Sequence, residues 1–417
     1  MGTHHQPIAA GTWLRRALGK IRRSAPVTRT TGFFALQARR ARQRLSSRFV
    51  RGVWLDTGKY VASAPRGVFG IYHRDIEPAG ETTIASPTFA PRPPPLIPGG
   101  SIHLSWRSRG LAILQRPWVV GSTGAVIGTD RRLLWDLSYQ WPGQPHRHTS
   151  YDLGDLAAVD LCGSTATLAA MGADENYFHF LLNSVARLAY LRRAPRQVAA
   201  PDRYLLSGRV TPFVAETLAL FGIPRERIVG TADYPAVRPD HLIAPPLVYH
   251  PFVVPRHICE FLRSEILAAL PPRRRKLRRI FIDRSDAAAR RIQNLDALRP
   301  LLEDFDIEVM RLSGRSVLEQ AALFNEAELI IANHGAALAN LVFCEPGTRV
   351  FQILAPDMME REYRTISQHG RLRHDYIVAE FASLDDLHLP RKQRDLILSS
   401  KILHDVLETE SRISLPT

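Results

Sequence analysis

Four polar side chains recur at helical spacing in a segment that is otherwise mostly apolar. Asn176, His179, Asn183 and Arg187 fall within about 80° of one another on a wheel of 100° per residue. A narrow polar stripe of this kind faces a cleft, a polar partner or water. An ordinary solvent face more commonly carries Glu and Lys, so we expect this stripe to face a cleft.

The same segment holds residues that could move a proton. His179 is a candidate general base, because the ordinary pKa of imidazole lies near neutrality. Asp174 and Glu175 stand at the start of the predicted helix and are the other candidates for this role.

A second group of residues is suited to binding a diphosphate. A strand predicted over 329–332 leads directly into Asn333, His334, Gly335 and Ala336. Glycine lets the backbone approach a ligand, and the helix start after it offers free N–H groups and a positive dipole end. His334 could donate to a phosphate oxygen. The alternative is a tight turn in which glycine serves packing alone.

Upstream, basic residues follow a strand predicted over 279–282. They are Arg284, Arg290 and Arg291, with Asn294 after them. In a parallel sheet the carboxyl end of this strand lies on the same edge as His334, where arginines neutralise a diphosphate by bidentate contacts. A loop of surface arginines would have the same local sequence.

The elements that must position these residues alternate regularly. Strands are predicted over 279–282, 307–312, 329–332 and 349–354, and helices over 295–303, 317–325 and 336–343. Strands separated by helices of about ten residues require right-handed crossovers and a parallel sheet covered on both faces. The sequence therefore predicts a doubly wound α/β domain. A further helix is predicted over 176–192.

Composition and charge narrow the class of protein. A chain of 417 residues, 45% of them hydrophobic, predicts about two to three folded domains. No stretch is apolar enough to span a membrane, and no secretory signal pattern is present. Three scattered cysteines form neither a disulfide framework nor a zinc site, and no metal site is expected.

The net charge of +15 comes mainly from the first residues. Residues 1–51 carry twelve bases and no acid, which leaves 43 bases against 40 acids in the rest. Leu14, Ala17, Leu18 and Ile21 give this leader a short amphipathic pattern that would suit an anionic membrane surface. The alternative is a solvated tail. Nucleic-acid binding is disfavoured, because the body is nearly neutral and no recognition motif is present.

Two segments together resemble glycosyltransferase family 61, also described as a capsular polysaccharide biosynthesis type. The first runs from Glu175 through Asn176-Tyr177-Phe178-His179-Phe180 to Arg187-Leu188. The second starts at Ile280-Phe281-Ile282-Asp283-Arg284 and includes Arg290-Arg291, Asn294 and Glu319-Gln320. It ends in Asn333-His334-Gly335-Ala336-Ala337-Leu338-Ala339-Asn340 and Pro346-Gly347-Thr348. The resemblance covers roughly residues 165–356.

This resemblance implies a GT-B-like α/β fold, with two Rossmann-like domains and parallel sheets facing across a cleft. It implies an inverting, metal-independent glycosyltransferase that uses a nucleotide-sugar donor, UDP-linked by expectation, and no cofactor. The acceptor would be a glycan or a lipid-linked sugar of a cell-envelope or capsular polysaccharide. The expected regions are a basic extension over 1–60, an acceptor-side domain over 61–255 and a nucleotide-sugar domain over 256–417, whose last helix packs back on the N-terminal domain.

The resemblance also assigns roles to individual residues. His179, Asp174 or Glu175 would be catalytic, and Asn176, Asn183 and Arg187 would line the acceptor side. The residues expected to bind the donor are Arg284, Arg290, Arg291, Asn294, Gln320, His334, Gly335, Ala336, Asn340 and Gln352.

The chain departs from the family pattern at Asn183, Leu295, Glu345 and Gln352. A non-catalytic nucleotide- or glycan-binding module of the same fold is therefore the alternative function. We expect a cytoplasmic protein, with the basic leader as a peripheral contact to the inner face of the cell membrane.

Overall fold

The structure of this chain is a computed structural model that describes residues 49–65, 67–90, 100–141, 143–152, 157–248, 253–271, 277–358, 362–383, 388–390 and 393–414. Val50–Ser150 and Leu156–Thr417 form one unit, which contains both large sheets. A second unit, Met1–Phe49 with Tyr151–Asp155, holds the basic leader. The amphipathic pattern over 14–21 lies outside the described residues.

The N-terminal half, residues 50–248, is built on a ten-stranded sheet with the order β1-β8-β7-β6-β12-β9-β10-β11, beside which β2 and β5 pair. Its strands are β1 (Gly52–Trp54), β2 (Gly70–Glu77), β5 (Arg109–Gln115), β6 (Trp118–Val120), β7 (Ala125–Ile127), β8 (Arg132–Leu134), β9 (Val159–Thr167), β10 (Arg203–Leu206), β11 (Ile228–Gly230) and β12 (Ala236–Ala244). The first strand pairs with β8, so the folded part begins before the boundary expected at residue 60.

This sheet is mixed, whereas we expected it to be parallel. Only β1 with β8 and the group β12, β9, β10 and β11 are parallel. Four residues join β6 to β7 and β7 to β8, and connections this short allow only antiparallel hairpins. The parallel part is the part that carries the predicted catalytic segment, since residues 168–176 follow β9.

The C-terminal half, residues 277–414, confirms the predicted parallel sheet. Its strand order is β14-β13-β15-β16-β17, with every pair parallel. The strands are β13 (Arg278–Ile282), β14 (Ile307–Met310), β15 (Ala327–Asn333), β16 (Arg349–Leu354) and β17 (Arg373–Val378). The chain passes from β13 to β14 on one side and then to β15 on the other, so the direction of winding reverses between β13 and β15.

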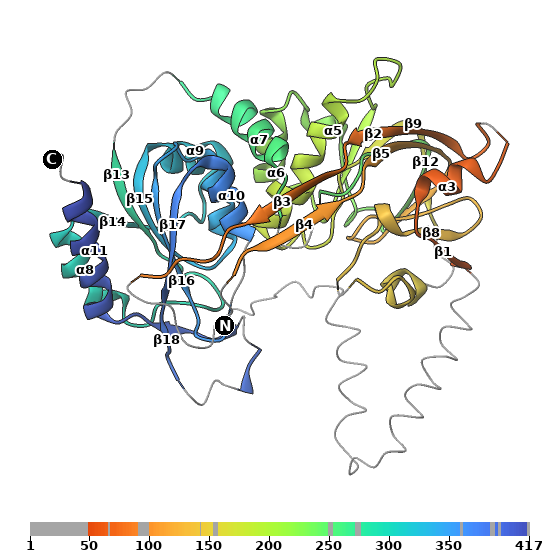
Figure 1. Ribbon diagram of the computed structural model, residues 1–417. Helices are drawn as coiled ribbons and strands as arrows, with labels where there is room; N and C mark the ends of the chain where they lie inside the picture. The colour runs from red at the N-terminus through yellow and green to blue at the C-terminus, as the bar shows by residue number, and fades with distance from the viewer. Residues whose placement is uncertain are drawn as a thin grey trace, which may run out of the picture. The chain divides into compact units, whose positions relative to one another are not determined.

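Helices cover both faces of this sheet. They are α8 (Leu295–Asp304), α9 (Val317–Glu326), η8 (Ala336–Phe343), α10 (Glu362–Gly370) and α11 (Ser400–Ser414). Figure 1 shows α8 and α11 on one face and α9 and α10 on the other. The expectation that the last helix packs on the N-terminal domain is wrong: Leu403, Val406 and Leu407 of α11 join the core under α8, because that face of the C-terminal sheet needs an apolar cover.

The helix predicted over 176–192 forms as a continuous path with a changed period. It consists of α4 (Tyr177–His179), a π-helical turn η5 (Phe180–Ser184), a 3₁₀ turn η6 (Val185–Arg187) and α5 (Leu188–Arg192). A π turn uses more residues per turn, so every residue after it is rotated from its place on an ideal α-helical wheel. This rotation moves Arg187 away from the stripe that begins at Asn176.

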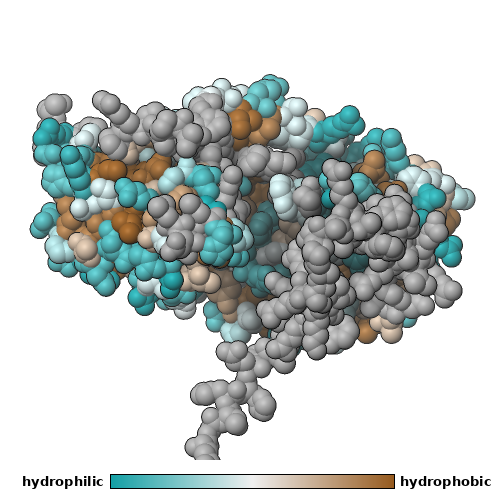
Figure 2. Space-filling view, turned by 90° about the horizontal axis from the view of Figure 1, so that it is seen from below, coloured by the Kyte–Doolittle hydropathy of each residue, from teal (hydrophilic) through white to brown (hydrophobic). Residues whose placement is uncertain are grey.

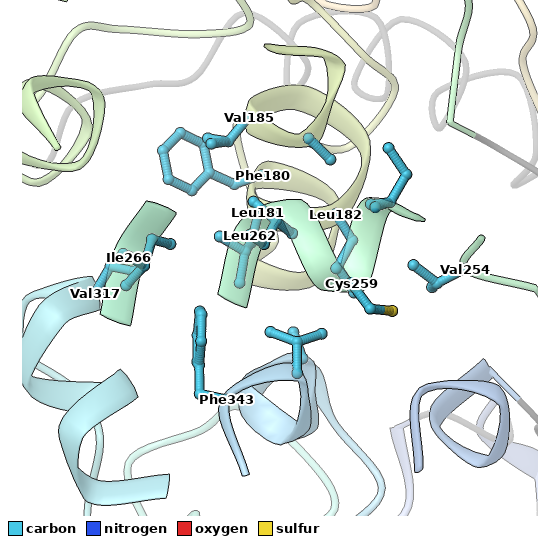
Figure 3. Packing of buried hydrophobic residues seen from close by; sticks show 14 of the residues in the cluster. Phe180, Leu181, Leu182, Val185, Val254, Cys259, Leu262, Ile266, Val317 and Phe343 are labelled. Carbon is cyan, nitrogen blue, oxygen red and sulfur yellow. The ribbon is translucent and has the colours of Figure 1, made fainter. Parts of the chain in front are cut away.

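A continuous apolar cluster joins the two halves through α7 (Arg256–Ala268), which lies between them in the chain. Figure 3 shows Phe180 and Val185 of the N-terminal half on one side of α7, and Val317 and Phe343 of the C-terminal half on the other. Leu262 and Ile266 of α7 are 0% exposed. The halves are therefore held together by packed side chains as well as by the chain connection.

A second connection crosses from the N-terminal half to the edge strand β17. The hairpin of β3 (Gly80–Ile84) and β4 (Ile102–Trp106) leads to residues 85–90, where Thr88 and Ala90 exchange backbone hydrogen bonds of 2.9 Å with Tyr376. Phe89 packs on the ring of Tyr376 with centroids 5.6 Å apart. Figure 1 shows β3 and β4 reaching toward this sheet.

The remaining elements are short or lie at the periphery. They are α3 (Thr57–Ala62), α6 (Pro212–Ala219), β18 (Glu380–Phe381), β19 (Leu396–Ile397), η2 (Trp135–Leu137), η3 (Pro145–Arg147), η4 (Thr149–Asp152) and η7 (Arg225–Arg227). Among the described helices, none has the length and apolarity needed to cross a membrane. Figure 2 shows hydrophilic and hydrophobic residues interspersed over the face seen from below.

Candidate functional site

The predicted phosphate-binding residues lie where the winding of the C-terminal sheet reverses. Asp283 and Arg284 follow β13, and His334 and Gly335 follow β15, its parallel neighbour. In open α/β sheets, ligands bind outside the carboxyl ends of the strands at this reversal, because the two outgoing loops diverge there and leave a crevice. Arg284 and His334 are thus brought together as the sequence predicted.

Arg284 lies in this crevice without an ion pair to a carboxylate among the described residues, although the charge of Asp286 acts on it from nearby. Burial and the neighbouring charge of Arg290 lower the pKa of Arg284. Within the described part of the chain no carboxylate forms an ion pair with this guanidinium, and its Nε is buried with no hydrogen-bond partner. Two close arginines in a partly desolvated position favour an anion that bridges them.

The neighbouring loop is held in an uncommon conformation. Arg290 has φ of 59°, a left-handed value that costs energy for a side chain other than glycine. The amide of Asn333, at the end of β15, donates to the backbone carbonyl of Arg290 at 2.6 Å. Asn333 stands next to His334 in the same short run, and no individual role was predicted for it from the sequence.

Gln352 orients the imidazole of His334. The register places Gln352 beside Ala332 on β16, and its Nε2 lies 2.9 Å from Nδ1 of His334. When this amide nitrogen donates, Nδ1 is the acceptor and the ring carries its proton on Nε2. His334 then has the donor that a phosphate oxygen needs, and Gln352, expected to contact the donor itself, acts through His334.

The helix predicted over 336–343 forms with the expected bounds as the 3₁₀ helix η8, which begins at Ala336. Gly335 occupies the position before it, and no side chain among the described residues caps its start. The first N–H groups of a helix have no internal partner and carry a partial positive charge. They lie beside His334 and add to the positive character of the crevice.

Asn340 and Gln320 join the two halves in a buried network. The hydroxyl of Tyr177 donates to Oδ1 of Asn340 at 2.7 Å, and Nδ2 of Asn340 donates to Oε1 of Gln320 at 2.9 Å. Gln320 in turn donates to the carbonyl of Arg315 at 3.1 Å. Burial raises the pKa of Tyr177, so its hydroxyl remains a donor. These two predicted donor-binding side chains therefore fix α4 against the start of η8.

Arg291 and Asn294 are directed away from the crevice. Arg291 pairs with Asp395 at 2.6 Å, and Asn294 exchanges hydrogen bonds with the backbone of Leu398. Both hold the segment that leads to α11. The structure does not bring these two predicted donor-binding residues to Arg284.

His179 is fixed on three sides. Its Nδ1 lies 2.9 Å from Nδ2 of Asn183, one helical turn later. A Cβ on Gly172 would stand 3.0 Å from its ring, so glycine at this position, with φ of +73°, leaves room for the imidazole. The ring of Phe178 meets it edge to face at 5.4 Å.

His179 and His334 are connected through two intervening rings. Phe178 packs on Tyr363 at 5.6 Å, and Tyr363 packs on His334 at 5.3 Å. Tyr363 comes from α10 and is 4% exposed. No local pattern in the sequence marked Tyr363, because its place depends on how α10 packs against η8.

A cleft of about 680 Å³ separates the carboxyl edges of the two sheets. On the N-terminal side Asp174, Glu175 and Asn176 line it. On the C-terminal side it is lined by Gln320, Ala337 and residues 312–316, which follow β14. Asn176 also caps α4, since its Oδ1 accepts from the N–H of Phe178 at 2.9 Å. The two predicted carboxylates and the start of η8 thus share one cleft.

Arg187 is not part of this cleft, contrary to its predicted place on the acceptor side. It is 0% exposed and donates to the carbonyls of Ala169, at 2.7 Å, and Pro245, which follow β9 and β12. Burial lowers its pKa to about 9. The π turn before Arg187 rotates it inward, where it ties together the ends of two parallel strands.

Asp283 is held by its neighbours. Burial opposes its ionisation, but the Arg311 guanidinium at 2.9 Å and the N–H and hydroxyl of Ser285 outweigh this effect and lower the pKa of Asp283. Among the described residues, no three His, Cys, Asp or Glu side chains are grouped as ligands for a metal ion.

Comparison with known proteins gives one result that overlaps this site. Residues 177–351 match the family model described as Glycosyltransferase 61. The match begins in α4 and ends in β16, and so includes His179, Arg284, His334 and Asn340. No curated protein sequence matches the chain.

Proposed function

We propose the following chemistry from the premise that residues 177–351 are a glycosyltransferase family 61 domain and that this chain is a glycosyltransferase. It transfers a sugar from a nucleotide-sugar donor to a hydroxyl group of a glycan or lipid-linked acceptor, with inversion at the anomeric carbon. Its two α/β halves act as the two sides of a GT-B-like enzyme. The C-terminal half binds the donor and the N-terminal half faces the acceptor.

The observation that carries this proposal is the anion site at the reversal of the C-terminal sheet. The charge of Arg290 acts on Arg284 there, and Arg284 forms no ion pair among the described residues, although Asp286 offsets part of this repulsion. His334 and the start of η8 complete a set of donors on the same edge. Such a set stabilises the charge that develops on a departing nucleoside diphosphate.

The reaction needs one base and one leaving group. The base takes the proton of the acceptor hydroxyl, its oxygen forms a bond to the anomeric carbon, and the bond from that carbon to the diphosphate oxygen breaks. We assign the role of base to His179. Asp174 and Glu175 are the alternative bases, and the variants described below distinguish them from His179. Asn183 accepts from Nδ1–H of His179 once its amide is turned by 180°, and Nε2 is then the acceptor that a base requires.

Positive side chains take the place of a metal ion in this proposal. Transfer activity should therefore be unchanged after treatment with EDTA. A loss of activity that Mg²⁺ or Mn²⁺ restores would contradict metal independence while leaving the transferase function intact.

The decisive experiment measures donor binding and transfer on the same preparation. We expect UDP, or another of GDP, CDP and dTDP, to bind the pure protein in calorimetry, and H179A to reduce transfer more than donor affinity. D174N and E175Q should retain more activity than H179A. Nucleotide binding without transfer or donor hydrolysis would favour the non-catalytic alternative, and absence of nucleotide binding would reject the donor site.

We also propose that the basic leader contacts an anionic membrane at the inner face of the cell membrane, where lipid-linked acceptors of cell-envelope polysaccharides would be reached. The twelve bases within residues 1–51 support this proposal. The full chain should sediment with vesicles containing phosphatidylglycerol at low salt, and a chain lacking residues 1–48 should not. Equal sedimentation of both would overturn it.

A further inference from the structure

The cleft between the two sheets has a lining that differs from that of the anion site. Part of its lining is aromatic: Phe213 packs on Tyr177 and Phe180, with centroids 6.2 and 5.6 Å apart. Phe213 remains half-buried, so part of it faces the cleft. A flat apolar side chain in the lining of a cleft offers a surface for the C–H face of a ring.

Polar side chains line the same cleft. Asn176, Thr211 and Ser313 offer amide and hydroxyl groups, and Arg209 and Arg315 offer guanidinium groups. The amide and hydroxyl groups both donate to and accept from neutral hydroxyl groups, and the guanidinium groups donate to them. A volume of about 680 Å³ falls within the range of sites that enclose a ligand larger than one small group.

The carboxylates of the cleft are available to a ligand. Asp174, Glu175 and Glu216 are exposed, and within the described residues none of them has an ion pair or side-chain hydrogen bond. Arg315 donates instead to the carbonyl of Arg311 at 3.0 Å, and Arg209 lies 3.8 Å from Asp233. Three carboxylates against two arginines make this cleft unsuitable for a diphosphate and suitable for hydroxyl groups that donate.

The cleft is adjacent to the proposed base. Asn176 lines the cleft, and His179 follows it by three residues on the same helical path, a spacing that places side chains on neighbouring positions. Ala337, in the first turn of η8, lines the opposite side. His179 and His334 do not line the cleft themselves, but the helical path that carries His179 and the helix that follows His334 both border it.

From these observations we infer that the cleft binds an uncharged oligosaccharide, so that the acceptor is a glycan chain recognised over more than one sugar unit. One sugar stacks on Phe213, and its neighbours donate hydroxyl hydrogens to Asp174, Glu175 and Glu216. This inference rests on the proposed function and decides its acceptor class. A lipid carrier bound through its tail, or a small alcohol, would make no use of these side chains.

The test compares acceptors of increasing length. Methyl glycosides and the corresponding di-, tri- and tetrasaccharides of glucose, galactose, mannose, xylose and N-acetylglucosamine are assayed with the donor that calorimetry identifies. For the sugar series that is accepted, kcat/KM should rise about tenfold or more from monosaccharide to trisaccharide, because remote units contribute binding energy. No dependence on length in any series, or transfer to none of them, would overturn the inference.

Variants of the cleft identify the subsites. Phe213→Ala should raise the acceptor KM about tenfold with little change in donor KM, and Phe213→Tyr should restore it. Glu216→Gln tests a carboxylate on the exposed surface of α6, and Glu226→Gln is its control outside the cleft. An unchanged acceptor KM in both Phe213→Ala and Glu216→Gln contradicts the inference. UDP binding is measured for the same variants. If they bind UDP normally while the acceptor KM is unchanged, the inference about the cleft is wrong and the proposed donor site still stands.

Discussion

Gly335 lies directly against the guanidinium of Arg284. A Cβ built on Gly335 would stand 2.3 Å from Nη1 of Arg284, a distance that no real contact reaches. Gly335 has extended backbone angles that any residue adopts, so a larger side chain here would displace the end of the Arg284 side chain without straining the backbone. The glycine of this turn therefore serves to admit a cation to the helix start.

Arg284→Ala and Gly335→Ala should both weaken nucleoside diphosphate binding. A hydrogen bond to a charged group contributes about 1.5–3 kcal/mol, so Arg284→Ala should raise the Kd about 10- to 100-fold. Gly335→Ala should act in the same direction by displacing the guanidinium. Calorimetry with UDP or the preferred nucleotide measures both, and Arg299→Ala, an exposed arginine on α8 that pairs with Asp296, is the control. An unchanged Kd in Arg284→Ala would remove Arg284 from the site.

Asn183→Asp should change how transfer depends on pH. A carboxylate beside Nδ1 stabilises the protonated imidazole of His179, and a base must be neutral to act. The acid limb of the kcat profile should therefore move to higher pH by about one unit. The aspartate also holds the proton on Nδ1, which should raise the rate on the alkaline side. An unshifted limb would assign the titrating base to another residue, and His179→Gln should abolish the limb.

Local sequence predicted the elements between residues 279 and 354 closely, because each of them is bounded by its own signals, whereas α10 and β17 were not predicted. The helix over 336–343 has the predicted bounds, since Gly335 precedes it and its residues are nearly all apolar. The positions of Arg284 and His334 followed from the rule that parallel strands end on one edge. These predictions needed no knowledge of distant contacts.

Other side chains depend on partners that local sequence does not reveal. Asn294 donates a hydrogen bond to the backbone of Leu398, which is 104 residues away in the sequence. Arg291 donates to Asp395 across the same separation. Arg187 was assigned from an ideal α-helical wheel, and the π turn over Phe180–Ser184 changed its direction. The antiparallel hairpins of the N-terminal sheet were not expected, because the resemblance implied parallel sheets in both domains.

Tyr177→Phe should destabilise the protein by loosening the contact between the halves. Its hydroxyl donates to Asn340 at 2.7 Å in a buried position, and the variant leaves Oδ1 of Asn340 without this donor. We expect the free energy of unfolding to fall by about 1–3 kcal/mol, measured by urea denaturation. Tyr234→Phe, at a tyrosine that is 40% exposed, is the matched control and should change nothing. Equal stability of the two variants would show that the network does not hold the halves.

Stability should decline in mild acid because of buried neutral histidines. Burial, with the charge of Arg364, lowers the pKa of His374 to about 3, whereas an unfolded histidine titrates near 6.5. Between these values the unfolded chain binds a proton that folded His374 does not, so the free energy of unfolding falls as the pH falls. His148, with a pKa lowered by burial to about 4, acts in the same direction.

His374→Gln tests this origin of the acid sensitivity. The amide does not titrate and can still bond to the hydroxyl of Ser367, which lies 2.7 Å from Nδ1 in the wild type. Between pH 7 and 5 the variant should lose about 1–2 kcal/mol less stability than the wild type, as measured by denaturation at each pH. Parallel pH curves for the two proteins would assign the acid sensitivity to other groups.

Arg290 combines a left-handed backbone with a charge at the anion site, and two substitutions separate these properties. Both Arg290→Gly and Arg290→Ala remove the guanidinium, so both should weaken nucleotide binding by about tenfold. Only glycine adopts φ of 59° without steric cost, so Arg290→Gly should be more stable than Arg290→Ala by about 1 kcal/mol. Urea denaturation measures the stabilities and calorimetry the affinities. One outcome is that Arg290→Gly is the more stable variant and both variants bind the nucleotide poorly. The wild-type fold then accepts an unfavourable backbone conformation at residue 290 because the arginine is needed for binding. If the two variants are equally stable, Asn333 does not impose the left-handed backbone, and the loop takes it up only in the presence of arginine.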